Sequence, residues 1–236
     1  MASEAEAVIY LANQRSRSET DWFRSYYTFN SGDLTLEDRT PFGSLFAINE
    51  HTLKEGRTLS FAFTEKVKVM LLPIEGELNY KSGDVENTVD VGQVSCIVSS
   101  PGVPLQISNH YASRLINFLQ ICVHVDDNVQ PNLNHTYSFD LDSSNEFIPL
   151  GLSSVTSSDE RFYIGKFRGR QEVVFRTQRH DMGIFVYEIT GTCEVHERLL
   201  LPGDALSIKG VEVIELEALT SEAIVLVAEI PLRMTS

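Results

Sequence analysis

The sequence predicts an all-β protein built from two consecutive copies of one barrel or sandwich domain. Apolar and polar residues alternate along residues 67–97, and an alternation of period two is typical of a strand with a buried face. The same pattern returns along residues 183–208. Two glycines keep their places in both stretches, with spacings of 115 residues for Gly76 and Gly191 and of 111 residues for Gly92 and Gly203. A repeat at that distance predicts two copies of a domain rather than a solenoid.

Short apolar segments separated by Gly- and Pro-containing turns predict the strands of the first domain, and no segment has the period of an amphipathic helix. In the central segment, alternate apolar residues are expected to share one buried face, and Gly76 among them indicates a bend or bulge. These residues are Met70, Leu72, Ile74, Leu78 and Tyr80. The expected strands, beginning with an edge strand, are 7–11, 43–49, 59–63, 67–80, 91–97, 103–109 and 114–125.

A change in composition separates the two domains. Residues 126–160 are rich in Asp, Asn, Ser and Pro, which predicts a linker. We therefore expect a first domain at residues 1–125, a linker at 126–160 and a second domain at 161–236. A chain of 236 residues, 42% of them apolar, suffices for two domains of about 100 residues, each with its own core.

Charge and hydropathy restrict the partners and the compartment. The formal net charge is −14 and no run of Lys or Arg interrupts it, so we expect neither direct nucleic-acid binding nor binding to anionic membranes. A basic protein would suit this surface better. The N-terminus lacks an apolar signal region, and no segment approaches the roughly 18 apolar residues of a membrane span. Together these features predict a cytoplasmic protein.

Three cysteines, Cys96, Cys122 and Cys193, form no CxxC pair and cannot all be bridged, which fits a reducing compartment. Apolar neighbours favour buried, unreactive thiols at these positions. The alternative interpretation is a redox sensor, which requires at least one accessible thiolate.

Several short motifs, taken in order, resemble those of the pirin family, most closely its YhaK-type, pirin-like bacterial branch. The resemblance spans nearly the whole chain and implies a bicupin, that is, two tandem cupin (jelly-roll, RmlC-like) barrels. The motifs are Asp21-Trp22 with Tyr27-Thr28-Phe29, Gly43-Ser44-Leu45 with Ile48-Asn49 and Gly56, Ile74-Glu75-Gly76-Glu77 with Tyr80, and Leu119-Gln120-Ile121.

The resemblance also implies where a metal would be held. Iron-binding pirins are expected to use an H-x-H pair and an H-x-E pair, whose alternate residues point the same way from two strands. Counting back from Gly76 places the first pair at Ala62 and Thr64, and the second pair falls near Gln106 and Ser108. None of these four residues is a strong iron ligand. We therefore expect no metal and no cofactor.

Three hypotheses about function follow. The first is a metal-free, non-enzymatic bicupin that binds a small molecule or a protein as a sensor or regulator. Its pocket would lie near the mouth of the first barrel, lined by Phe61, Phe63, Thr64 and Gln106, although the same residues are compatible with a filled core. The second is an iron-dependent oxidoreductase of the quercetin 2,3-dioxygenase type that uses shifted ligands such as His110. The third is cysteine-based redox sensing.

Overall fold

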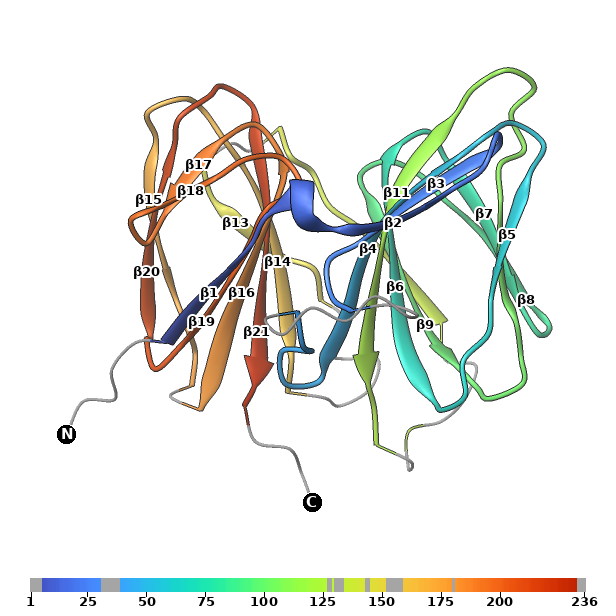
Figure 1. Cartoon of the computed structure of the whole chain (residues 1–236), viewed down its shortest axis with the longest axis horizontal. Helices are drawn as coiled ribbons and strands as arrows, with labels where there is room; N and C mark the ends of the chain where they lie inside the picture. The colour runs from blue at the N-terminus through green and yellow to red at the C-terminus, as the bar shows by residue number, and fades with distance from the viewer. Residues whose placement is uncertain are drawn as a thin grey trace.

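The computed structural model describes residues 6–30, 39–126, 129, 134–142, 145–151, 159–179 and 181–232. Within these ranges the chain consists of strands and one 3-10 helix, η1 (Ala12–Gln14). The strands form two barrels that lie side by side (Figure 1). The predicted all-β, two-barrel architecture is confirmed.

The first barrel consists of a seven-stranded and a four-stranded antiparallel sheet. The large sheet has the order β12 (Asn134–Ser138), β9 (Gln93–Ser99), β6 (Val67–Glu75), β11 (Ile116–His124), β4 (Leu45–Leu53), β3 (Phe23–Tyr27) and β2 (Ser16–Glu19). The small sheet has the order β5 (Thr58–Phe61), β10 (Leu105–Ser108), β7 (Leu78–Ser82) and β8 (Val85–Val89).

The second barrel repeats this plan with a six-stranded and a four-stranded sheet. The large sheet has the order β1 (Glu6–Tyr10), β19 (Ala205–Lys209), β16 (Met182–Thr190), β21 (Ala223–Pro231), β14 (Arg161–Phe167) and β13 (Phe147–Pro149). The small sheet has the order β15 (Glu172–Arg176), β20 (Val213–Ala218), β17 (Cys193–Val195) and β18 (Arg198–Leu200).

The path of the chain between the barrels differs from the predicted domain boundaries. Strand β1 was expected in the first domain, but it pairs with β19 and belongs to the second barrel, as Figure 1 shows. The predicted linker contributes a strand to each barrel, because β12 pairs with β9 and β13 pairs with β14. Part of that linker, residues 127–128, 130–133, 143–144 and 152–158, lies outside the described residues. Strands β1, β12 and β13 each pair with the edge of a sheet, whose backbone N–H and C=O groups would otherwise be unpaired.

The predicted repeat is confirmed in detail. Gly76 and Gly191 follow the last strand residues of β6 and its equivalent β16, with φ values of 73° and 85°. The ladder with the neighbouring strand shifts register just before each glycine, next to Ile74 and Ile189. A Cβ on Gly191 would lie 2.7 Å from Ala223 Cα, so this position requires glycine for space as well as for its backbone angles.

The large sheets are buried on both faces, which corrects the expectation of one buried face. Along β6, Val67, Val69 and Leu71 point into the first barrel. Met70 and Leu72 instead point toward the second barrel and join an apolar cluster contributed by both large sheets. The bend at Gly76 then turns β7 so that its apolar residues, Leu78 and Tyr80, return to the interior of the first barrel. The cluster between the barrels includes Ile48, Leu119, Ile121, Phe162, Phe185, Tyr187, Leu226 and Ala228.

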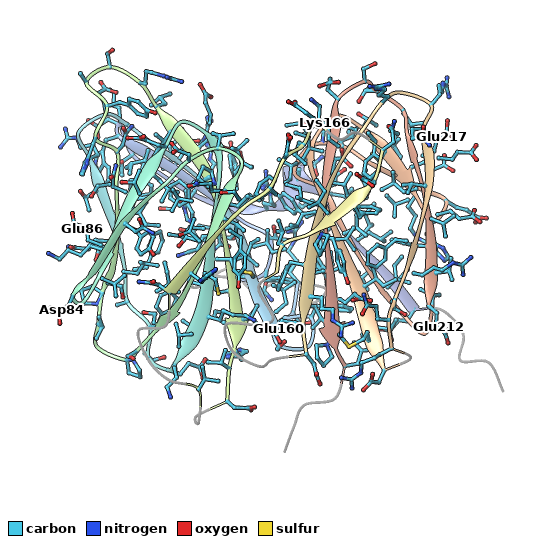
Figure 2. The ribbon with its side chains drawn as sticks, turned by 180° about the vertical axis from the view of Figure 1, so that it is seen from behind. Asp84, Glu86, Glu160, Lys166, Glu212 and Glu217 are labelled. Carbon is cyan, nitrogen blue, oxygen red and sulfur yellow. The ribbon has the colours of Figure 1, made fainter. Side chains whose placement is uncertain are left out.

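One ion pair is buried between the barrels. Lys68, on the outward face of β6, contacts Glu160, which immediately precedes β14 of the second barrel, and their side chains are 0% and 4% exposed. In Figure 2, Glu160 lies near the junction, whereas Asp84 and Glu86 lie on the far side of one barrel and Glu212 on the far side of the other. These exposed acidic residues therefore lie away from the apolar junction.

Candidate functional site

Only some of the residues predicted to line a pocket in the first barrel point into that barrel. Phe61, the last residue of β5, and Phe63 are half-buried and pack against the barrel core. Ala62 and Thr64 alternate with them and are exposed. The apolar half of the predicted lining therefore belongs to the core, while the two positions expected to correspond to H-x-H face solvent.

The second predicted pair also lies on the outer surface. Leu105 and Ile107 of β10 point inward with no exposed area, so the alternating Gln106 and Ser108 point outward. Gln106 is exposed, and the Ser108 hydroxyl lies 2.9 Å from the Thr58 hydroxyl on the neighbouring strand. Gln106 and Ser108 therefore do not line the interior. His110, beyond the end of β10, is exposed as well.

One polar group inside the first barrel is centred on His51. Its ring is fully buried, with Nδ1 2.7 Å from Ser25 Oγ and Nε2 3.3 Å from Gln120 Oε1. Asn49 Nδ2 also donates to Gln120 Oε1, at 3.4 Å. Because that oxygen can only accept, Nε2 carries the imidazole proton and Nδ1 accepts from the Ser25 hydroxyl. His51 is thereby held as a neutral imidazole.

Burial among aromatic rings stabilises that neutral state. The His51 ring lies 5.1 Å from the rings of both Phe61 and Phe118. Burial lowers the pKa of His51 to about 4, with a smaller opposing effect from its hydrogen bond to Gln120. The sequence did carry a signal for this group, because Ala47, His51 and Leu53 share one parity of β4.

The interior side chains around His51 do not form a metal-binding site. One imidazole is present, and both of its nitrogens already have partners. The inward positions around it on β5 and β10 are Leu59, Phe61, Leu105 and Ile107, none of which can ligate a metal. Among the residues that the structure describes, no group of three or more His, Cys, Asp or Glu could hold a metal ion.

The three cysteines are free, buried thiols. Burial raises the pKa of Cys96 to about 12 and raises the pKa values of Cys122 and Cys193 well above their usual range. A thiol in that state forms almost no thiolate near neutral pH. The redox-sensor hypothesis requires an accessible thiolate, and three buried thiols do not favour it in the folded chain.

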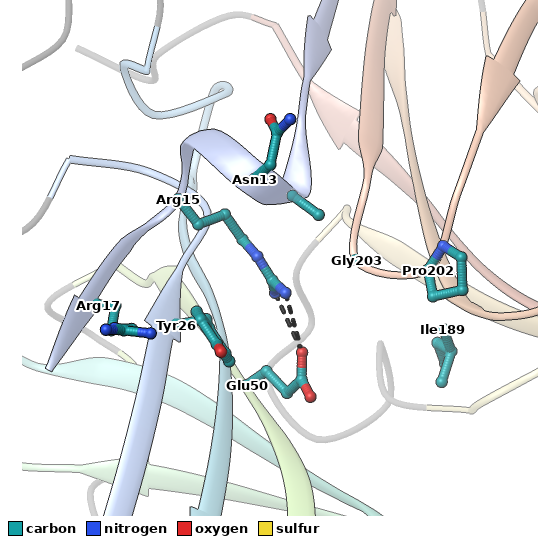
Figure 3. A pocket seen from close by; sticks show the side chains of 9 residues that line it. Asn13, Arg15, Arg17, Tyr26, Glu50, Ile189, Pro202 and Gly203 are labelled. Atoms are coloured by element: carbon teal, nitrogen blue, oxygen red, sulfur yellow. Dashed lines mark hydrogen bonds and ion pairs between the residues drawn. The ribbon is translucent and has the colours of Figure 1, made fainter. Parts of the chain in front are cut away.

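A pocket of about 610 Å³ opens at the junction between the barrels (Figure 3). One wall is a row of residues paired directly across three strands of the first barrel, Arg17 of β2, Tyr26 of β3 and Glu50 of β4. Ala12 and Asn13 come from η1, and the second barrel supplies Ile189, Pro202 and Gly203. Sequence reasoning did not find this pocket, because its walls come from five separate segments of the chain.

Arg15 connects both barrels at the base of this pocket. Its two terminal nitrogens each lie 3.1 Å from Glu50 Oε2, and Nη1 also donates to the Tyr187 hydroxyl of the second barrel at 2.9 Å. The guanidinium lies over the Tyr26 ring, 4.7 Å from its centroid. Arg15 is thus held in place by both barrels and by an aromatic face.

Two tandem jelly-roll barrels with packed interiors define the chain as a bicupin. Residues 153–230, which form most of the second barrel, match the family described as Quercetinase C-terminal cupin domain. The fold is similar to that of bacterial pirin YhhW from Escherichia coli, whose crystal structure is a nickel(II) complex. The TM-score is 0.83 at 15% identity over 96% of this chain and 99% of that one.

Two further solved structures have the same fold. YhaK from Escherichia coli gives a TM-score of 0.72 at 17% identity, over 92% of this chain and 94% of that one. Quercetin 2,3-dioxygenase from Acinetobacter baumannii gives 0.71 at 13% identity, over 96% and 86%. The protein therefore has the two-barrel, bicupin fold of these structures. No curated protein matches its sequence, and no helix in the described part of the chain is long and apolar enough to cross a membrane.

Proposed function

We propose that this pirin-like bicupin is a metal-independent binding protein of the cytoplasm, acting as a sensor or regulator through a small ligand or a protein partner. The observation that carries the proposal is the interior of the first barrel. There a single neutral imidazole, His51, is held by Ser25 and Gln120 and packed against phenylalanine rings. A buried, fully partnered group of this kind stabilises a core and leaves no open coordination position for a substrate.

A second candidate is an iron-dependent oxidoreductase of the quercetin 2,3-dioxygenase type. The match of residues 153–230 to the quercetinase C-terminal cupin domain favours it. An iron site in this chain would need ligands other than the residues at the four expected positions, 62, 64, 106 and 108. His110 is the histidine nearest to these positions in sequence. His110 is exposed, so a site there would have to form at the surface of the first barrel.

Metal content and oxygen consumption separate the two candidates. The protein is produced in medium supplemented with iron and zinc, purified without chelator and analysed for bound metals, and quercetin-dependent oxygen uptake is then measured. Our proposal predicts metal far below one equivalent and no uptake above that of free iron. Stoichiometric iron, together with uptake that His110→Ala abolishes, would overturn the proposal in favour of the dioxygenase. His135→Ala, which also removes an exposed histidine of the first barrel, is the matched control.

A further inference from the structure

The pocket at the junction has the chemistry of an anion site within a strongly acidic protein. The chain carries a formal charge of −14, yet Arg15 and Arg17 line this pocket against a single carboxylate, that of Glu50. A third guanidinium, that of Arg24, lies 5.5 Å from the centroid of the Tyr26 ring. Among the lining residues, two guanidiniums thus accompany one carboxylate, which favours an anionic ligand over a cationic one.

The two lining arginines have different roles. The Arg15 side chain is 7% exposed and is bound to Glu50, so it belongs to the wall. Its Nε–H nevertheless has no acceptor among the described residues, which leaves this buried charge incompletely satisfied. The Arg17 side chain is 60% exposed, and its contact with Glu19 is a loose surface pair at 3.5 Å. Arg17 is therefore the guanidinium that an incoming ligand can engage.

The opposite wall is apolar. Ile189 and Pro202 face the arginines across the pocket, as Figure 3 shows. A ligand that fits both walls carries an acidic group at one end and an apolar body at the other. A carboxylate matches the planar fork of a guanidinium, and the volume of about 610 Å³ accommodates a small organic molecule.

We propose that this pocket binds a small organic carboxylate, with the carboxylate on Arg17 and its apolar body against Ile189 and Pro202. The inference rests on the proposed binding function and names the site and the ligand class. Because the walls belong to both barrels and to the segment that links β1 to β2, such a ligand would contact both barrels at once.

The test uses para-fluorobenzoate as the probe and fluorine NMR as the readout, on the full chain. We expect saturable binding below about 10 mM, with acetate and benzyl alcohol each binding more weakly because each lacks one half of the probe. Arg17→Gln should weaken binding about three- to tenfold, whereas Arg176→Gln, which removes an exposed arginine of β15, should leave it unchanged. Ile189→Ala should weaken the binding of para-fluorobenzoate but not that of acetate.

Two outcomes would overturn the inference: no saturable binding of the probe, or equal binding by wild type and Arg17→Gln. Thermal unfolding of each variant confirms that it is folded, which Arg17→Gln should be because the side chain is mostly exposed. A failure to bind para-fluorobenzoate does not bear on the metal content or the oxygen uptake of the protein, which are measured separately. Failure of this inference is therefore distinguishable from failure of the proposed function.

Discussion

Glu188 offers the most direct test of the electrostatics of the second barrel. It lies on β16, has no exposed area and points into the barrel, where Cys193 Sγ donates to its Oε1 at 3.7 Å. Its Oε2 has no hydrogen-bond partner among the described residues. Burial raises the pKa of Glu188 from 4.5 to about 8, and its contact with Cys193 opposes this only in part. At neutral pH the folded protein therefore holds this carboxyl in its protonated form.

The consequence for stability has a definite sign. Below about pH 4.5 both the folded and the unfolded chain carry the proton, so Glu188 contributes no pH dependence. Between about pH 4.5 and 8 only the unfolded chain releases it, so the free energy of unfolding falls as the pH rises. One pKa unit corresponds to about 1.4 kcal/mol, which gives about 4–5 kcal/mol for the whole shift.

The substitution Glu188→Gln removes this titration while keeping the shape and the Oε1 acceptor. We expect it to raise the free energy of unfolding by about 2–4 kcal/mol at about pH 7.5 and to change it little at about pH 4.5. Urea titrations at both pH values measure the difference. Glu194→Gln, on the exposed face of β17, is the control and should have no such effect. A gain that is equal at both pH values, or absent at both, would refute the reasoning.

The remaining predictions concern the first barrel and the junction. Lys68→Met leaves the Glu160 carboxylate buried without its cation and should lower the free energy of unfolding by about 3–5 kcal/mol, while adding Glu160→Gln should restore most of the loss. If the single substitution costs less than about 1 kcal/mol in urea, the Lys68–Glu160 pair is not the buried, uncompensated interaction that this prediction assumes. His51 stays neutral in the folded chain down to about pH 4, so only the unfolded chain gains a proton as the pH falls from 6.5. The wild type should thus lose about 2 kcal/mol by about pH 5, and His51→Gln should remove that slope; an unchanged slope would assign the acid sensitivity to other groups.

The parts of the fold that were predicted correctly rest on local properties of the chain. Alternation along a strand, and glycines with positive φ such as Gly76 and Gly191, depend on a few neighbouring residues, so the duplicated barrel could be read from them. The pairing of β1 with β19 depends instead on which edge is free in the assembled molecule, and no local pattern encodes that. The burial of β6 on both faces likewise depends on the second barrel packing against the first.

The candidate site was harder to predict for the same reason. Counting residues placed Ala62 and Thr64 at the presumed ligand positions, but β5 ends at Phe61, and only the folded chain shows which side chains then turn inward. His51 could have been noticed from its parity in β4, although its partners Ser25 and Gln120 come from strands far away in sequence. The pocket at the junction depends entirely on the contact between barrels.

The exchanged first strand also determines when the molecule can be completed during synthesis. Glu6 pairs with Lys209, so β1 leaves the ribosome long before its partner β19 has been translated. Until then β1 is an unpaired strand that can associate with other chains. For the same reason the second barrel cannot be cut out as a self-sufficient fragment from residue 161 onward, because two of the strands in its large sheet would be left behind. The two barrels are distinct folding patterns that pack together, and the exchange of β1 makes each depend on the rest of the chain.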